Sequence, residues 1–338
     1  MKKITVKKPL TIGITMGDPS GIGPEIILKC VQNNRFGNHR LIVIGDYLVM
    51  QRAHDLLQIE SYKLHRISDI GECLFTTGTL NILDLHLVTL NDFHPGRVLA
   101  ASGNVAFQCI RKAVELARDK SIDTLVTAPI NKEALHLAGH LYPGHTEILA
   151  SLTGTRDYAM LLHDKKLSII HVSTHISLLE AITGLRAERI EKVIGMAHKT
   201  MKKLCEGEPR IAVAGINPHA GEHGLFGKEE IREIIPAIRK MKDTGIHVEG
   251  PFPPDTIFLQ AVNGKFDVVV AMYHDQGHIP LKLIGFSSGV NVTLGLPFVR
   301  TSVDHGTAFD IAWKGEAMED SMVEAIRLSM VLSQSTEF

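Results

Sequence analysis

Runs of apolar, β-branched residues alternate along this 338-residue chain with segments of helical periodicity, and this alternation restricts the possible folds more than any other feature. The runs lie at residues 11–16, 41–44, 124–127, 159–162, 167–172, 211–216 and 268–272. Between them, at 107–117 and 231–241, apolar residues recur at three- and four-residue steps, as they do on one face of a helix. Strands that alternate with helices form mostly parallel sheets covered on both faces. The sequence therefore predicts an α/β fold with an α/β/α arrangement of layers.

The length of the chain allows one large α/β unit or two subdomains. No internal repeat, low-complexity stretch or flexible linker marks a clean domain boundary. We therefore predict a single α/β/α unit over residues 1–338, with two subdomains on either side of a cleft. Their approximate bounds are 1–128 together with 285–338, and 129–284.

The charge balance and the cysteines exclude several classes of protein. Lys and Arg total 36 against 37 Asp and Glu, so the net charge of -1 offers no electrostatic footprint for nucleic acid or an anionic membrane. No apolar run approaches the length of a membrane span. The four cysteines are scattered without a Cys-x-x-Cys pair, which predicts buried, reduced thiols. These features together predict a cytoplasmic protein without nucleic-acid or membrane partners.

Three histidines follow three of the predicted strands. His175 comes after the run at 167–172, His219 after 211–216 and His274 after 268–272. Ligands of open α/β sheets bind at the carboxyl ends of strands. Neutral imidazole is the commonest metal ligand in proteins, and three imidazoles leave a coordination position open for substrate. The pattern predicts a catalytic divalent-metal site, although coincidence among 18 histidines is the alternative.

A glycine-rich turn follows the first predicted strand, with the sequence MGDPSGIGPE at 16–25. Such a turn can bring backbone amides to an anion, and Pro24 suits the first turn of a helix. The segment matches neither the P-loop nor the Gly-x-Gly-x-x-Gly dinucleotide fingerprint. The segment is therefore either a structural turn or an anion-binding site, and the sequence alone leaves both interpretations open.

Five polar residues are candidates for binding an anionic substrate. His145 and Thr146 open a predicted helix and can donate hydrogen bonds to phosphate or carboxylate, although Thr146 could equally cap the helix. Lys282 follows the third histidine, and Asn291 and Arg300 lie in a turn-rich segment. Ammonium and guanidinium groups complement phosphate oxygens. Each residue alone is more often a solvated surface residue, so the prediction of a clamp on a small phosphorylated acid depends on their convergence with the histidines.

Five motifs are spread along the chain: MGDPSGIGPE at 16–25, GHTE at 144–147, NPHAGE at 217–222, YHDQG at 273–277 and TSVDHGT at 301–307. Together they resemble the successive motifs of the 4-hydroxythreonine-4-phosphate dehydrogenase family, from about residue 10 to the C-terminal helix. The segments at 131–140 and 277–282 look more like the branch that acts on D-threonate or D-erythronate 4-phosphate, and His278 stands where the biosynthetic branch often has an apolar residue.

The resemblance implies a fold akin to the isocitrate and isopropylmalate dehydrogenases, which bind NAD without the Rossmann glycine fingerprint. It also implies a homodimer in which ligands from both subunits hold one divalent metal ion, zinc, manganese, magnesium or cobalt, at the subunit interface. The metal ligands would be His175, His219 and His274. The substrate contacts would be His145, Thr146, Lys282, Asn291 and Arg300, with Lys282 and His145 as candidates for the general base.

The implied reaction is NAD-dependent oxidation at C3 and β-decarboxylation of a four-carbon, 4-phosphorylated acid. The expected substrate is D-threonate 4-phosphate or D-erythronate 4-phosphate, which yields dihydroxyacetone phosphate and CO2. The alternative is 4-hydroxythreonine 4-phosphate, on the path to pyridoxal 5'-phosphate. Remoter alternatives are a metal-dependent hydrolase, an acyl-phosphate transferase of similar architecture and a non-catalytic metal or solute binder.

Overall fold

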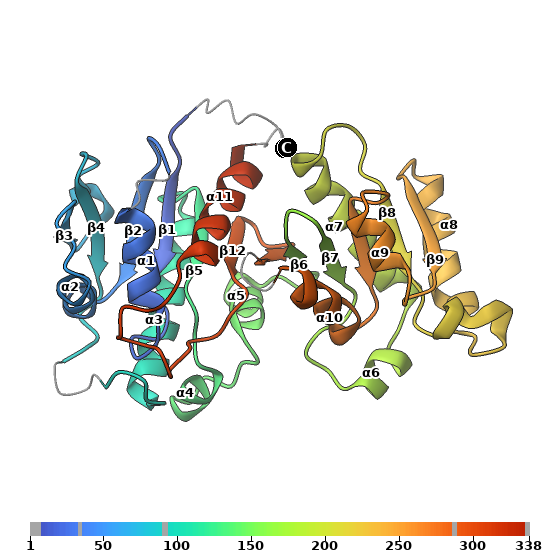
Figure 1. Ribbon diagram of the computed structural model, residues 1–338, viewed down its shortest axis with the longest axis horizontal. Helices are drawn as coiled ribbons and strands as arrows, with labels where there is room; N and C mark the ends of the chain where they lie inside the picture. Colours follow the sequence, from blue (N-terminus) through green and yellow to red (C-terminus); the bar gives the residue numbers. More distant parts are fainter. Residues whose placement is uncertain (1–7, 33–35, 90–93, 286–288, 335–338) are drawn as a thin grey trace. The chain divides into compact units, whose positions relative to one another are not determined.

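The computed structural model (Figure 1) describes residues 8–32, 36–89, 94–285 and 289–334. These residues form two compact units, which we call the first unit (8–156 and 296–334) and the second unit (157–295). The sequence suggested boundaries at 128/129 and 284/285 instead. Residues 129–156 stay with the first unit because helix α4 (Lys132–Leu137) packs backbone to backbone on α3 (Ala100–Arg118), where a Cβ on Gly103 would overlap the Ala134 carbonyl.

The sheet of the first unit is entirely parallel. Its strands follow the order β3-β4-β2-β1-β5-β12. All four residues of β5 are buried, as expected for strands covered on both faces. The bounds are β1 (Thr11–Thr15), β2 (Arg40–Gly45), β3 (Lys63–Ile67), β4 (Thr79–Asp84), β5 (Thr124–Thr127) and β12 (Val299–Val303).

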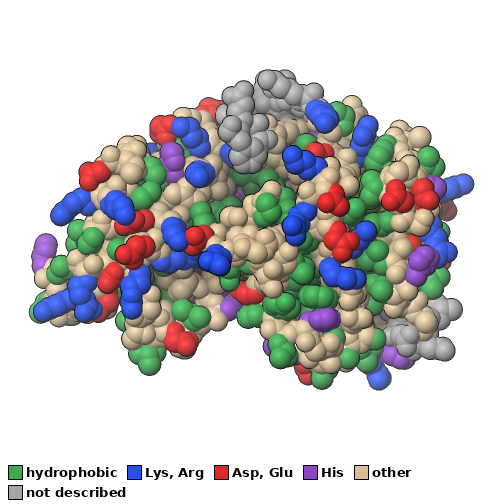
Figure 2. Space-filling view, turned by 180° about the vertical axis from the view of Figure 1, so that it is seen from behind, with side chains coloured by type: hydrophobic (Ala, Val, Ile, Leu, Met, Phe, Trp, Pro, Cys, Tyr) green, Lys and Arg blue, Asp and Glu red, His purple; other side chains and the backbone are tan. Residues whose placement is uncertain are grey.

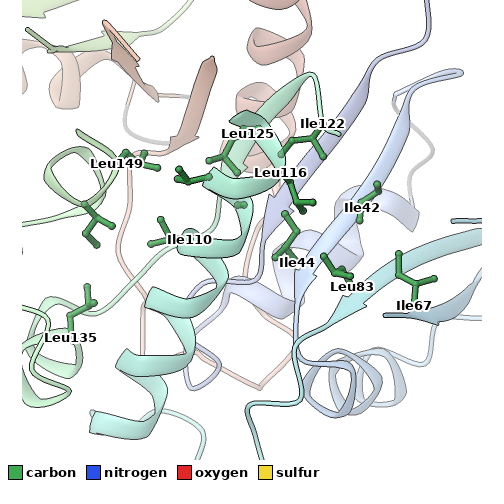
Figure 3. Close-up of a cluster of buried hydrophobic side chains, with 14 residues drawn as sticks. Ile42, Ile44, Ile67, Leu83, Ile110, Leu116, Ile122, Leu125, Leu135 and Leu149 are labelled. Carbon is green, nitrogen blue, oxygen red and sulfur yellow. The ribbon is translucent and has the colours of Figure 1, made fainter. Parts of the chain in front are cut away.

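Helices cover both faces of this sheet. On one face α3, α4 and α5 (His145–Thr153) bury their apolar side chains against the strands, in the cluster drawn in Figure 3. On the other face lies α11 (Asp320–Gln334), whose Ala325 carbonyl accepts a hydrogen bond from the Thr301 hydroxyl at 2.8 Å. Because side chains alternate along a strand, Arg300 then faces α5 rather than α11. The remaining helices are α1 (Gly23–Gln32), α2 (Tyr47–Leu56) and the short η1 (Ile70–Glu72).

The sheet of the second unit is mixed, with the order β11-β6-β7-β10-β8-β9. Strand β6 is antiparallel to both of its neighbours, whereas β7, β10, β8 and β9 run parallel to one another. The bounds are β6 (Ala159–His163), β7 (Ser168–His171), β8 (Ile211–Ala214), β9 (Val248–Phe252), β10 (Val268–Ala271) and β11 (Val290–Leu294).

Helices also cover both faces of the second sheet. Helices α9 (Ile257–Val262) and α10 (His274–Gly285) contribute Phe258 and Leu281 to an apolar cluster with the strands. Helix α7 (Ala187–Leu204) contacts β6, β7, β8 and β10 but adds none of its buried side chains to this cluster, so it covers the opposite face. The remaining elements are α6 (Leu178–Thr183), η2 (Pro218–Gly224), η3 (Glu230–Ile234) and α8 (Ile235–Asp243).

The predicted α/β class is confirmed, as are the seven predicted strands within one or two residues at most ends. The prediction of a turn-rich segment around Asn291 and Arg300 is wrong, because these residues lie inside β11 and β12. The glycine and proline residues that suggested a loop fall in the short turn between the two strands, where Gly295 has a φ of +92°. Strands β3, β4 and β9 were also not predicted.

Several surface properties follow from the same description. Acidic and basic side chains are interspersed with apolar ones on the face shown in Figure 2. Within the described ranges, no helix has the length and apolarity needed to cross a membrane.

All four cysteines are free, but only Cys30 and Cys109 are buried. The expectation of burial is wrong for Cys73 and Cys205, which are partly exposed.

Candidate functional site

The three histidines predicted as metal ligands follow three neighbouring parallel strands of the second unit. His175 lies four residues beyond β7, His274 is the first residue of α10 after β10, and His219 lies in η2 after β8. Because the order of these strands is β7-β10-β8, all three loops emerge at one edge of the sheet. This edge is where open α/β sheets bind ligands.

Two of these imidazoles lie close to each other. The ring centroids of His175 and His274 are 5.9 Å apart. The Nδ1 atom of His274 lies 2.7 Å from Oδ1 of Asp275, a contact that leaves Nε2 for a ligand and resembles the carboxylate–histidine pairs behind many metal sites. His219 has a 65% exposed side chain whose neighbours are Glu222 and Phe226.

The described part of the chain contains no group of three or more His, Cys, Asp or Glu side chains placed to hold a metal ion. A single chain therefore does not gather His175, His219 and His274 around one point. The metal site remains a prediction. Its donor chemistry fits a divalent ion such as zinc, because two imidazoles are neighbours and one of them has a carboxylate next to its Nδ1 atom.

Sequence reasoning missed two further histidines beside His274. His278 stacks on His274, with centroids 3.6 Å apart and planes 10° from parallel, and its centroid is 4.8 Å from that of His171. Burial, followed by the neighbouring His274, lowers the pKa of His278 to about 4. Burial, followed by the neighbouring His278, lowers the pKa of His171 to about 3. Both imidazoles are therefore neutral at pH 7.

The signal for both residues was present in the spacing. His171 precedes His175 by four residues, and His278 follows His274 by four, which is one helical turn along α10. Gly277 packs directly on His171, because a Cβ at that position would overlap Nε2. That Nε2 atom is buried without a hydrogen-bond partner among the described residues.

In the first unit, Arg300 forms the centre of a second polar group. Its side chain is 1% exposed, and Nη2 donates a 2.6 Å hydrogen bond to Oγ1 of Thr127 on the neighbouring strand β5. Burial lowers the pKa of Arg300 to about 9, an effect that the carboxylate of Glu147 opposes. The guanidinium therefore stays charged at neutral pH, in a setting where a cation is costly unless polar groups surround it.

His145 belongs to the same polar group. Burial of the imidazole, followed by the charge of Arg300, lowers its pKa well below the usual value, so the ring is neutral. Its Nε2 atom is buried without a partner in the described chain. Buried polar atoms are nearly always hydrogen-bonded, so an orphan atom beside a buried guanidinium indicates a place for a polar ligand.

Thr146 and the N-terminus of α5 complete this group. The helix begins at His145 after Gly144, which provides no side-chain cap, so the alternative interpretation of Thr146 as the cap of the helix is wrong. Thr146 is 4% exposed in the first turn, where backbone amides attract anions.

The other two predicted substrate contacts lie in the second unit. Asn291 is half-buried on β11, and its Oδ1 atom is buried without a partner in the part of the chain that the structure describes. Lys282 is exposed in α10, two turns beyond His274.

Comparisons with known proteins agree with the motifs. Residues 38–329 match the model of the family described as pyridoxal phosphate biosynthetic protein PdxA. A D-threonate 4-phosphate dehydrogenase of Pectobacterium atrosepticum is 52% identical over 95% of this chain and 99% of that protein. A 4-hydroxythreonine-4-phosphate dehydrogenase of Beijerinckia indica is 49% identical over 97% of this chain and 96% of its own.

A solved structure agrees as well. The crystal structure of a 4-hydroxythreonine-4-phosphate dehydrogenase from Klebsiella pneumoniae superposes with a TM-score of 0.85 at 51% identity, over 96% of this chain and 100% of that one. The family expected from the motifs is thereby confirmed. The chain belongs to the PdxA family, and with it to the oxidoreductases that act on a CH–OH group.

Proposed function

We propose that this protein is an NAD-dependent, divalent-metal-dependent dehydrogenase that oxidises C3 of a four-carbon, 4-phosphorylated acid and releases C1 as CO2. D-threonate 4-phosphate and D-erythronate 4-phosphate are the proposed substrates, with dihydroxyacetone phosphate as the product. The 52% identity with a protein named D-threonate 4-phosphate dehydrogenase supports this choice. The observation that carries the proposal is the buried Arg300 guanidinium beside the unpartnered Nε2 of neutral His145.

Arg300, His145 and Thr146 are proposed to bind the anionic groups of the substrate. A guanidinium fixed by Thr127 pairs with phosphate or carboxylate oxygens without first losing side-chain entropy. Neutral His145 offers Nε2 for a hydrogen bond, and the uncapped amides of α5 add their dipoles. Lys282 and Asn291 are proposed as further substrate contacts, since Asn291 has a buried oxygen without a partner among the described residues.

His175, His219 and His274 are proposed to hold the metal ion. When bound, the ion would supply Lewis acidity toward the oxygen on C3, the carbon that is oxidised. The carboxylate of Asp275 orients His274 by contacting its Nδ1. Within the described part of one chain the three imidazoles do not form a single metal-binding group, which is compatible with ligands drawn from two subunits.

A homodimer is proposed because the three imidazoles do not form one metal-binding group within the described part of the chain. A second reason is that apolar side chains of the second unit are exposed. On α6, Leu178 and Leu179 are 57% and 70% exposed. Leu225, which is close in sequence to His219, is 73% exposed. Contiguous exposed apolar patches mark association surfaces, and the adjacent leucines of α6 are our candidates for part of one. The free thiols and the lack of a membrane-crossing helix among the described residues support a cytoplasmic location.

The reaction requires one proton acceptor at the C3 hydroxyl. NAD accepts the hydride from C3, and the hydroxyl proton passes to a base. The C1–C2 bond then breaks as CO2 leaves, and its electron pair stays on C2, which takes up one proton to give the ketone product. His145 and Lys282 are the candidates for the base. Neutral His145 has one unprotonated ring nitrogen, which can accept this proton when it is not the nitrogen that donates to the substrate.

The substituent at C2 is the point on which the two relatives differ. A protein named 4-hydroxythreonine-4-phosphate dehydrogenase is nearly as similar, so an amine at C2 is the second candidate. NADH formation is measured with D-threonate 4-phosphate, D-erythronate 4-phosphate and 4-hydroxythreonine 4-phosphate at matched concentrations. Preference for the sugar acids supports the proposal, and preference for the amino acid supports the second candidate. Absence of NADH with all three would favour a hydrolase or an acyl-phosphate transferase.

A further inference from the structure

The loop that carries His219 has an uncommon backbone. Five successive residues, 219–223, have positive φ angles between 42° and 81°. Four of them are not glycine, and L-residues other than glycine rarely adopt this region because the Cβ approaches the backbone. Such a conformation persists only when the surrounding structure holds it firmly.

The side chain of Glu230 lies at the centre of this loop. It is 1% exposed, and Oε1 accepts hydrogen bonds from the backbone amides of Ile216 and Asn217, both at 2.8 Å. Its Oε2 accepts a third bond, at 2.9 Å, from Nδ2 of Asn217. Three donors from the base of the loop therefore converge on one carboxyl group.

The loop is also shaped around this carboxyl group. A Cβ on Gly221 would come within 2.7 Å of Oε2 of Glu230, and one on Gly215 within 3.2 Å of Oε1. A Cβ on Gly227 would overlap Nδ2 of Asn217. Glycine at these positions lets the backbone close over the side chain of Glu230, which thereby sets the path of residues 215–227.

A second anchor ties the start of the loop to the turn before His274. Nε2 of Gln276 donates to the Gly215 carbonyl at 2.7 Å, and Oε1 of Gln276 accepts from the Met272 amide at 2.6 Å. The backbone that leads to His219 is thus held relative to the backbone that leads to His274. The imidazole of His219, by contrast, is 65% exposed, so its position depends mainly on the backbone below it.

We propose that Glu230 is a positioning residue for His219: by holding the left-handed loop from inside, it presents this imidazole to the divalent metal ion. This inference rests on the metal assignment of the proposed function. Glu230 does not touch the metal in this arrangement, and it acts through the backbone of the loop.

Glutamine cannot replace glutamate here without leaving a mismatch. A carboxylate presents acceptors on both oxygens, as the three donors require, whereas an amide offers one oxygen and one NH2 group. In either orientation of the amide in Glu230→Gln, its NH2 group would face a donor, either the two backbone amides or Nδ2 of Asn217. The buried mismatch favours opening of the loop.

The test uses Co²⁺ as the probe, bound to full-length protein that has been freed of metal by chelation. Glu230→Gln is expected to raise the Kd for Co²⁺ on the order of tenfold, as loss of supporting contacts around metal ligands does. The visible absorption of bound Co²⁺ is expected to change with the displaced ligand. Amide hydrogen exchange in residues 215–225 is expected to accelerate, while the melting temperature and the Kd for NAD stay close to those of the wild type.

Glu233→Gln is the matched control. Glu233 lies one turn further along the same helical segment and accepts a 2.9 Å hydrogen bond from the Ala187 amide, away from the loop. This variant is expected to bind Co²⁺ as the wild type does. Equal weakening in both variants would overturn the proposal, because the effect would then belong to the helix as a whole.

Three further outcomes complete the test. Wild-type affinity and absorption in Glu230→Gln, with binding lost in His219→Ala, overturn the inference and leave the proposed function standing. Wild-type Co²⁺ binding in His219→Ala overturns the metal assignment and the inference together. If Glu230→Gln fails to fold, Asn217→Ala decides, because it removes the Nδ2 donor that Glu230 shares with Glu229 and leaves the two backbone amides on Oε1 of Glu230. Weaker Co²⁺ binding supports the positioning role, and unchanged binding overturns it.

Discussion

Arg300 on β12 donates a 2.6 Å hydrogen bond from Nη2 to Oγ1 of Thr127 on the parallel strand β5. Both side chains lie on the face of the sheet that α5 covers, so the hydroxyl fixes one edge of a buried guanidinium under the start of that helix. Because the guanidinium is planar, this contact sets the direction of its other N–H groups as well.

Arg300→Ala is expected to raise the KM for the phosphorylated acid by about 10- to 100-fold, the equivalent of a charge-assisted hydrogen bond of about 1.5–3 kcal/mol. The KM for NAD is expected to change much less. Steady-state kinetics with each substrate varied in turn measure both values. An equal or larger effect on NAD would remove Arg300 from the substrate site.

Thr127→Val tests the orientation of Arg300 rather than its charge. Valine has nearly the same shape as threonine but cannot accept the hydrogen bond from Nη2. We expect the KM for the acid to rise only a few-fold, since the guanidinium remains in place with one donor unsatisfied. A change as large as that of Arg300→Ala would indicate that the Thr127 hydroxyl itself contacts the substrate.

His219→Ala is expected to lower metal-dependent turnover by more than about 100-fold, because even the outer partners of metal ligands are typically worth 10- to 100-fold. The side chain is largely exposed in the chain, so the melting temperature of the metal-free protein should not fall. Metal content by elemental analysis and NADH formation are measured on the same sample. Full activity with bound metal would sink the assignment of His219 as a ligand.

Asp18 gives a pH dependence of stability whose sign can be worked out. Burial raises its pKa from 3.8 to about 7, although the Ser20 amide donates to Oδ1 at 2.8 Å. The folded state therefore holds this proton more tightly than the unfolded state does. The resulting stabilisation is complete below about pH 4 and is lost as the pH rises through about 7.

Asp18→Asn removes this titration and keeps an oxygen for the Ser20 amide. The variant is therefore expected to gain stability relative to the wild type between about pH 5 and pH 8, as measured by thermal melts across that range. Asp157→Asn is the control, because Lys192 lowers the pKa of this exposed carboxyl and its charge is constant over the range. A difference for Asp18→Asn that does not grow with pH would contradict the expectation.

Gly103→Ala and Gly195→Ala form a matched pair in two long helices. A methyl group on Gly103 of α3 would overlap the backbone of Ala134 and force α4 away. We therefore expect the free energy of unfolding to fall by about 1–3 kcal/mol or more, as in other overpacked cores. Gly195 of α7 has open space, its nearest neighbour being Cε of Met241 at 3.8 Å. Alanine there is expected to stabilise by about 0.5–1 kcal/mol. Urea unfolding compares the two variants, and equal signs would contradict the packing described.

The local pattern of the sequence was sufficient for the strands β1, β2, β5, β6, β7, β8 and β10, because short apolar β-branched runs are a property of neighbouring residues. It was also sufficient to locate His175, His219 and His274 after strands. The local pattern did not predict the strand that contains Arg300. The glycine and proline residues between β11 and β12 suggested a loop, and these two short strands pair with partners that are far away in sequence.

By itself the sequence determined the α/β class, the family and the candidate ligands, since these depend on periodicity and on motifs that can be read along the chain. Only the tertiary structure decided that β10 lies between β7 and β8, which brings together three loops that are far apart in sequence. It also decided the position of Glu230, because a glutamate at the start of a helix usually faces solvent. This one is buried because the loop of residues 215–227 closes over it, with Gly215 and Gly221 against its carboxyl group, and no local pattern encodes that contact.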